Sequence, residues 1–200
     1  SIPYIDLKRT YLDEKSLTKV AAKYASLASQ KYLKGIVEKA RKNNSQGLIG
    51  KLTETTPDGM RLINNPPFIE HPDLSREGRK ISDLNDEGLN SYIKSLSPDR
   101  RNLLLRYKWM DSARKVVGVG SVGTACWVLY FEGLDASDSL FLQTKQAQKS
   151  VLASHFPDTE FKSEGERVFH GQCLIQGAPD LFLGFGKTVE VDFYIRQLRD

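Results

Sequence analysis

The feature that most constrains this chain is a glycine-rich loop between two segments that both have the composition of strands. Gly118, Gly120 and Gly123 follow the pattern G-x-G-x-x-G. In a dinucleotide-binding unit the third glycine opens a helix, whose N-terminus holds the pyrophosphate. Here the glycines are followed by T-A-C-W-V-L-Y-F, which is rich in β-branched and aromatic residues and favours a strand. The order strand, glycine loop, strand therefore argues against a dinucleotide-binding unit.

A lysine ends the next predicted strand. Residues 133–139 are rich in turn formers, and residues 140–145 have the pattern of a strand that ends at Lys145. In protein kinases a glycine loop between two strands covers the ATP phosphates, and a lysine on the following strand pairs with them and is held by a helix glutamate. A helix predicted over residues 163–176 supplies Glu164 and Glu166 as candidates. The pattern therefore predicts a nucleotide site.

The predicted fold class is α+β, with two parts. Residues 181–185 and 191–198 complete a set of about five strands, which is a usual size for a sheet. We expect residues 113–200 to form a kinase-like small lobe, an antiparallel sheet of about five strands plus one helix. Residues 1–112 would form a helical and hairpin extension in front of it.

Periodicity and turn signals predict the elements of this extension. Apolar residues at three- and four-residue spacing predict one helix over residues 13–42, with an apolar stripe against a partner. The turn sequence T-P-D-G predicts a hairpin over residues 48–63, and three prolines predict an extended connection over residues 65–77. Further helices are expected over residues 83–96 and from Ser97 to about residue 112.

Charge does not point to nucleic acid. The net charge is +4, and the first 42 residues hold ten Lys or Arg against four acidic residues, so the basic excess is local. A nucleic-acid surface would interleave basic residues with stacking aromatics. The candidates, Tyr24 and Tyr32, fall on the apolar side of the predicted helix. Nucleic acid is therefore not an expected partner.

The remaining motifs argue against metal, disulfide and membrane chemistry. Cys126 and Cys173 form no C-x-x-C pair, and the three histidines share no ligand spacing, so neither a disulfide nor a metal site is expected. No apolar run approaches the roughly 18 residues of a membrane helix, and the first residues are not a signal peptide, which favours a cytoplasmic location. The sequence G-F-G-K-T at residues 184–188 lacks the first glycine of a P-loop, and Gly186 and Lys187 within it are expected to form a hairpin turn.

Several blocks resemble a known family. V-V-G-V-G-S-V-G-T, L-F-L-Q-T-K-Q-A-Q-K-S-V-L, G-E-R-V-F-H-G-Q and D-F-Y-I-R-Q-L-R-D are similar to signature blocks of an uncharacterised bacterial family, the domain of unknown function numbered two-two-five-two. The resemblance is dense over residues 103–200 and weaker before them. It implies a kinase-like, aminoglycoside-phosphotransferase-like fold. It also implies that a catalytic loop and an acidic metal-binding motif lie upstream and a helical part downstream, so we expect an internal segment of a longer protein.

These observations give a set of predicted nucleotide contacts. The loop would hold the phosphates, Lys145 would neutralise their charge, and Glu166 would orient Lys145, in preference to Glu164, which would point about 200° away on the helix. The resemblance places Gln197 and Leu198 where a kinase-like hinge meets adenine. The predicted contacts are Gly118, Gly120, Ser121, Gly123, Lys145, Glu166, Gln197 and Leu198. Arg167 and Arg196 could bind phosphate or form internal ion pairs.

The leading functional hypothesis is a segment of an ATP-dependent phosphotransferase. ATP and Mg²⁺ are the expected cofactors, with the metal ligands and the catalytic base outside this chain and no catalytic residue within it. The partners would be the nucleotide, an unidentified small-molecule or protein acceptor, and the remaining parts of the polypeptide. Two alternatives stay open: a non-catalytic, pseudokinase-like binding or regulatory module, and a glycine loop with a purely structural role.

Overall fold

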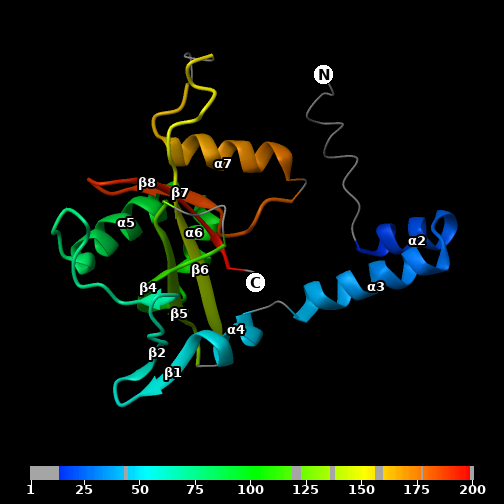
Figure 1. The fold of residues 1–200 in the computed structure, drawn as a ribbon, viewed down its shortest axis with the longest axis horizontal. Helices are drawn as coiled ribbons and strands as arrows, with labels where there is room; N and C mark the ends of the chain where they lie inside the picture. The colour runs from blue at the N-terminus through cyan, green and yellow to red at the C-terminus, as the bar shows by residue number, and fades with distance from the viewer. Residues whose placement is uncertain are drawn as a thin grey trace.

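The computed structural model shows a six-stranded antiparallel sheet with helices on both faces (Figure 1). It describes residues 14–42, 45–118, 123–135, 138–155, 160–176 and 178–198. The strand order is β3-β4-β5-β6-β8-β7, and β1 and β2 form a separate hairpin. The strands are β1 (Thr53–Thr56), β2 (Gly59–Leu62), β3 (Ile69–Glu70), β4 (Lys108–Lys115), β5 (Cys126–Glu132), β6 (Ser139–Gln146), β7 (Gly184–Lys187) and β8 (Asp192–Gln197). The helices are α2 (Glu14–Tyr24), α3 (Leu27–Lys42), α4 (Ser45–Leu52), α5 (Ile81–Ser95), α6 (Pro98–Leu104) and α7 (Glu164–Ile175).

The α+β class is confirmed, and so are the strands predicted around the glycine loop. Strands β4 and β5 flank the loop, β6 contains Lys145, and α7, β7 and β8 follow in the predicted order. Strands β5 and β6 are apolar on both faces because each face is covered, which hides the alternation of a half-buried strand. The short hairpin β1–β2 turns at Pro57 and Asp58, as the T-P-D-G sequence predicted.

Three predictions about the extension are wrong. The single helix over residues 13–42 is two helices, because Ser26 caps α3: its Oγ accepts a hydrogen bond of 3.2 Å from the Ser29 N–H. Residues 48–52 belong to helix α4, where Leu48 and Leu52 lie one turn apart and are both buried. The helix predicted to end near residue 112 stops at Leu104, because the segment from Lys108 to Arg114 pairs with β5.

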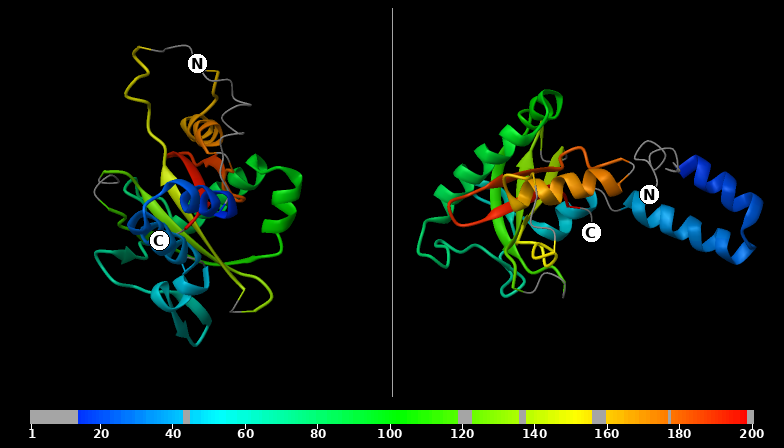
Figure 2. Two further views of the ribbon diagram at one scale, coloured as in Figure 1. Left: turned by 90° about the vertical axis from the view of Figure 1, so that its right-hand side faces the viewer. Right: turned by 90° about the horizontal axis from the view of Figure 1, so that it is seen from above.

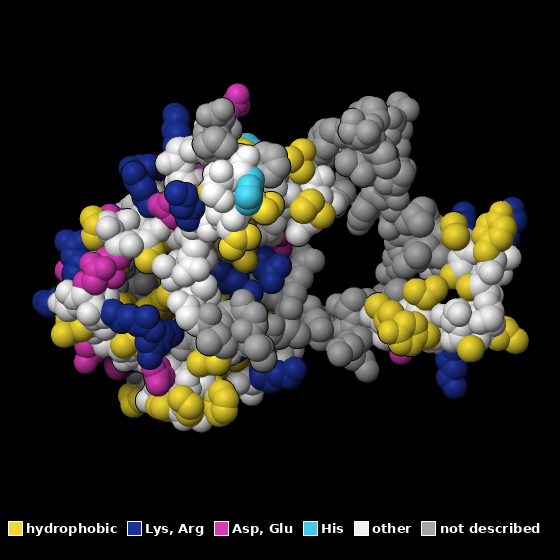
Figure 3. Space-filling model, turned by 45° about the horizontal axis from the view of Figure 1, so that its top comes forward, with side chains coloured by type: hydrophobic (Ala, Val, Ile, Leu, Met, Phe, Trp, Pro, Cys, Tyr) yellow, Lys and Arg dark blue, Asp and Glu magenta, His cyan; other side chains and the backbone are white. Residues whose placement is uncertain are grey.

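Helices α2 and α3 project away from the sheet as an arm (Figures 1 and 2). The predicted apolar stripe of this arm is largely exposed: Tyr24, Leu27 and Tyr32 have 74%, 85% and 72% of their surface accessible. Figure 3 shows these helices with apolar side chains in the open. Helices α2 and α3 contact each other and Ala21 is buried, so the arm itself supplies only part of the partner that the pattern predicted.

Helix α5 covers one face of the sheet, which we call the α5 face. Gly184 and Gly186 of β7 permit its close approach, because a Cβ on either would lie 2.6–3.0 Å from Tyr92 atoms. Tyr92 is fully buried, and its hydroxyl donates a hydrogen bond of 2.6 Å to the Phe182 carbonyl. Burial, with a smaller contribution from Asp180, raises the pKa of this hydroxyl, so it stays a neutral donor.

Helices α4 and α7 lie on the opposite face, which we call the α7 face. Gly165 of α7 packs directly on β8, and Phe169 of α7 contacts the ring of Phe185 on β7, with the ring centroids 5.4 Å apart. Helix α4 and the β1–β2 hairpin cover the far end of this face, around Tyr130 and Phe141. Strand β4 runs across residue 112, so packing is continuous over the boundary that the sequence suggested, and the division into two domains stays a prediction.

Candidate functional site

The two ends of the glycine loop have backbone conformations that favour glycine. Gly118 follows β4 with φ +58°, and Gly123 precedes β5 with φ +85°. A Cβ at either position would meet no atom within 4 Å, so backbone conformation rather than crowding favours glycine at both. Gly120 and Ser121, the predicted contacts at the tip, lie outside the described residues.

Lys145 lies beside the end of this loop. On β6 it pairs directly with Cys126 of β5, which is three residues beyond Gly123. Opposed residues of an antiparallel pair have Cα atoms about 4.5–5.5 Å apart, so the loop end and the lysine are close neighbours. The adjacency predicted from sequence is therefore present.

Lys145 points to the α7 face of the sheet. Its neighbours Thr144 and Gln146 line a cavity on the α5 face, and side chains alternate along a strand. Across the sheet Lys145 pairs with Tyr194, which pairs in turn with Phe185, against which α7 packs. Helix α7 packs on β8, the strand next to β6, as well as on β7, so Lys145 lies about 4.8 Å from the nearer strand that α7 covers.

The structure does not bring Glu166 to Lys145 as an ion pair. Glu166 Oε2 accepts a hydrogen bond of 2.8 Å from the Lys162 N–H, and its own N–H donates to the Ser163 Oγ at 3.1 Å. These bonds cap the first turn of α7, and the local sequence S-E-G-E, a capping box, was a signal that the sequence reading missed. Among the described residues no carboxylate pairs with Lys145.

Glu164 and Arg167 pair with each other. Arg167 Nε donates to Glu164 Oε2 at 2.6 Å, and Arg167 Nη2 donates to the Gln148 carbonyl at 3.0 Å. Of the two readings that the sequence left open for Arg167, the internal ion pair is the one present.

Arg196 adds a second cation to the face that carries Lys145. It lies on β8 opposite Gln143, two residues beyond Tyr194, and such diagonal neighbours are about 7–8 Å from Lys145. Its Nε is buried and has no hydrogen-bond acceptor among the described residues. Burial raises the pKa of the intervening Tyr194 hydroxyl, and Arg196 partly opposes this shift. Asp192 occupies the other diagonal position on β8, where its carboxylate accepts the Glu164 N–H at 2.9 Å, so the two cations on this face are partly offset by one acid.

The two predicted hinge residues point in different directions. Leu198 is 3% exposed and packs in the core with Tyr130 and Phe141, and its N–H donates to the Phe141 carbonyl at 2.9 Å. Gln197 pairs with Leu142, whose side chain belongs to the core on the α5 face. Neither side chain is brought beside Lys145.

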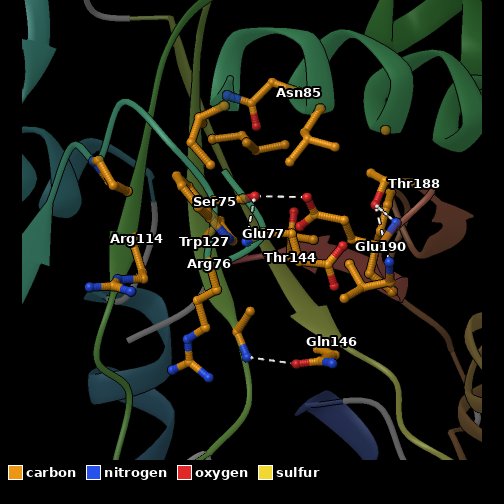
Figure 4. A pocket seen from close by; sticks show the side chains of 18 of the residues that line it. Ser75, Arg76, Glu77, Asn85, Arg114, Trp127, Thr144, Gln146, Thr188 and Glu190 are labelled. Carbon is orange, nitrogen blue, oxygen red and sulfur yellow. Dashed lines mark hydrogen bonds between the residues drawn. The ribbon is translucent and has the colours of Figure 1, made fainter. Parts of the chain in front are cut away.

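A second feature, which the sequence reading missed, is a cavity of about 590 Å³ on the α5 face (Figure 4). Its apolar walls come from α5 and the sheet, and its polar groups include Ser75, Thr144 and Glu190. The walls are assembled from five stretches that are far apart in sequence, so no local sequence motif predicts the cavity.

Two further features are absent from the described residues. In that part of the chain, no group of three or more His, Cys, Asp or Glu residues is arranged to hold a metal ion. None of the described helices combines the length and apolar character needed to cross a membrane.

Comparison with known proteins identifies a family without assigning an activity. No curated protein and no solved structure matches the chain. A family model described as an uncharacterised protein conserved in bacteria, DUF2252, matches residues 5–200. The match extends over nearly the whole chain, including the arm and the hairpin, where the sequence resemblance was weak. The chain therefore belongs to the DUF2252 family of uncharacterised bacterial proteins.

Proposed function

We propose that this chain is the nucleotide-binding lobe of an ATP-dependent phosphotransferase. The observation that carries the proposal is the position of Lys145, one strand from the end of the glycine loop and on the face against which α7 packs. In protein kinases a lysine on the third strand approaches the ATP phosphates in this way. The acceptor, the Mg²⁺ ligands and the catalytic base would come from outside this chain. The protein would act in the cytoplasm.

The order of the elements supports this proposal. Strand β4, the glycine loop, β5, β6 with its lysine, and then α7, β7 and β8 follow the order of the nucleotide-binding parts of a kinase. In the proposal, backbone N–H groups of the loop, including those of Gly120 and Ser121, approach the phosphates. Lys145 and Arg196 supply positive charge where the phosphates would lie.

Glu166 would orient Lys145 only after a local rearrangement. Its carboxylate now accepts the Lys162 N–H at the start of α7. Pairing with Lys145 therefore requires the first turn of α7 to give up this bond. Nucleotide binding would favour the conformation in which Glu166 pairs with Lys145 over the one in which it accepts the Lys162 N–H.

Lys145→Ala is expected to lower the affinity for ATP with Mg²⁺ at least about tenfold, because it removes a cation beside the end of the loop. The measurement is a thermal shift of the intact protein over a range of ATP concentrations. Ligand at a hundred times Kd stabilises the native state by about 2.7 kcal/mol. Lys187→Ala, which removes an exposed lysine from β7, is the matched control and should bind like wild type. Equal shifts in wild type and Lys145→Ala would defeat the assignment.

A non-catalytic nucleotide-binding module is the second candidate. The observation that favours it is the use of Glu166 as a helix cap rather than as a partner of Lys145. Both candidates predict ATP binding that depends on Lys145. Only a phosphotransferase is expected to form ADP from ATP, at a rate that is higher for the intact wild-type protein than for Lys145→Ala.

A further inference from the structure

We infer that the cavity on the α5 face is a second ligand site, for a small primary amine with an apolar body. It is distinct from the proposed nucleotide site because Lys145 points to the other face of the sheet, although Thr124 and Ala125, directly after Gly123, line part of it. Its volume of about 590 Å³ falls in the usual range of about 300–1,000 Å³ for small-molecule sites.

The body of the ligand is indicated by the apolar walls. Leu84 and Leu89 of α5 form one side, and Trp127, Leu129 and Ile195 of the sheet form the other. Gly88 lies between the two leucines, and a Cβ there would come within 3.3 Å of Phe193, so the helix approaches the sheet closely and the cavity is narrow at this point. A flat ring or a short alkyl chain fits between such walls and would lose its water on binding.

The charge of the ligand is indicated by Glu190. This half-buried carboxylate lines the cavity, and its Oε1 accepts a hydrogen bond of 2.7 Å from the Ser75 hydroxyl, which reaches across from the loop before α5 (Figure 4). Within the described residues Glu190 pairs with no cation. Of the two arginines that line the cavity, Arg114 pairs with Glu70 and Arg76 is exposed to water. The least solvated charge in the wall is therefore negative, which favours a cation and repels a carboxylate or phosphate.

Thr144 and Trp127 indicate why the cation is a primary amine. The Thr144 side chain lines the cavity and is half-buried, and its hydroxyl has no hydrogen-bond partner among the described residues. An ammonium group has three donors, so it can donate to the Glu190 carboxylate and to a hydroxyl together. The indole of Trp127 adds an aromatic surface that attracts a cation.

The test compares two probes that differ in one group, phenethylamine and 2-phenylethanol. Binding to the intact protein is followed by tryptophan fluorescence, with Trp127→Phe to show that the signal comes from the cavity. We expect phenethylamine to bind about tenfold tighter than the alcohol. Glu190→Gln keeps an acceptor for Ser75 and should remove this preference, whereas Glu54→Gln, at an exposed position on β1, should keep it.

Backbone amide spectra give a second readout that does not depend on fluorescence. Phenethylamine should shift the amide signals of residues around Thr144 and Glu190 in wild type but not in Glu190→Gln. Equal affinity of the two probes for wild type would overturn the inference. So would a preference that survives in Glu190→Gln, or amide spectra that do not change with either probe.

Discussion

Replacing Gly165 with alanine is expected to lower the free energy of unfolding by about 2–4 kcal/mol. Gly165 is buried in the first turn of α7, and a Cβ there would lie 2.3 Å from the Phe193 carbonyl oxygen and 3.3 Å from the Phe185 Cβ. The first contact is with backbone in the middle of the sheet, which cannot give way as the end of a flexible side chain can. Helix α7 would have to move off β8.

The same helix supplies the control. A Cβ at Gly171 would meet nothing within 4 Å, and alanine favours helix over glycine by about 0.8–1 kcal/mol. Gly171→Ala should therefore leave the free energy of unfolding unchanged or raise it slightly. Urea unfolding followed by circular dichroism measures both variants. Similar small changes in the two would mean that α7 does not rest on β8 as closely as described, and the proposed place of Glu166 would lose its support.

Asp111→Ala is expected to cost about 2–4 kcal/mol of stability, because this buried carboxylate joins three segments. Asp111 Oδ2 accepts the Leu62 N–H at 2.9 Å and lies 3.2 Å from His71 Nε2, and Asp111 Oδ1 accepts the Ser112 N–H at 2.8 Å. The hairpin β1–β2 and the connection before α5 are thus both tied to β4. Alanine would leave the Leu62 N–H buried without its acceptor.

Two further substitutions separate the role of the carboxylate from general damage. Asp111→Asn retains one acceptor oxygen and should lose less stability than alanine. Asp86→Ala, at an exposed position on α5, should stay within about 0.5 kcal/mol of wild type. Denaturant unfolding with a probe in the hairpin gives the readout. A loss below about 1 kcal/mol in Asp111→Ala would show that the three segments are held by apolar packing alone.

Sequence patterns predicted the sheet well because its signals are local. Gly118 follows the end of β4 and Gly123 precedes the start of β5. Turn formers precede β6, and the apolar runs of β5 and β6 have the composition of strands. Lys145 could be placed because it ends one of these runs. Which side chains of neighbouring strands lie beside one another could not be predicted in this way, because that depends on the register between the strands.

The errors arose where a non-local contact or a cap overrides periodicity. The apolar period of the arm continues through Ser26, so the pattern alone does not show the break between α2 and α3. Residues 108–112 have apolar positions that fit a helix, and pairing with β5 decides for a strand. The spacing of Leu48 and Leu52 fits a helix as well as a strand, and burial against the sheet selects the helix.

The candidate site was only partly predictable for the same reason. The loop and Lys145 were visible as motifs, whereas Arg196 became part of the site only when β8 was placed beside β6. Glu166 was expected to pair with Lys145, as in a kinase, but its position in a capping-box sequence also favours a helix cap. The capping bond is the one present. The cavity around Glu190 is built from α5, three loops and four strands, so nothing in the sequence predicted it.

The most direct test of the central claim is chemical labelling of Lys145 with an acyl phosphate of ATP. A lysine amine held near the phosphates attacks the acyl carbon, the bond from that carbon to the terminal phosphate oxygen breaks, an amide forms on Nζ and ATP leaves. Mass spectrometry of the digested protein locates the amide. We expect Lys145 to be labelled and excess ATP with Mg²⁺ to suppress its labelling, while labelling of the exposed Lys187 is not suppressed. Labelling of Lys145 that ATP does not suppress, or that stays no greater than that of Lys187, would contradict a nucleotide site beside the glycine loop.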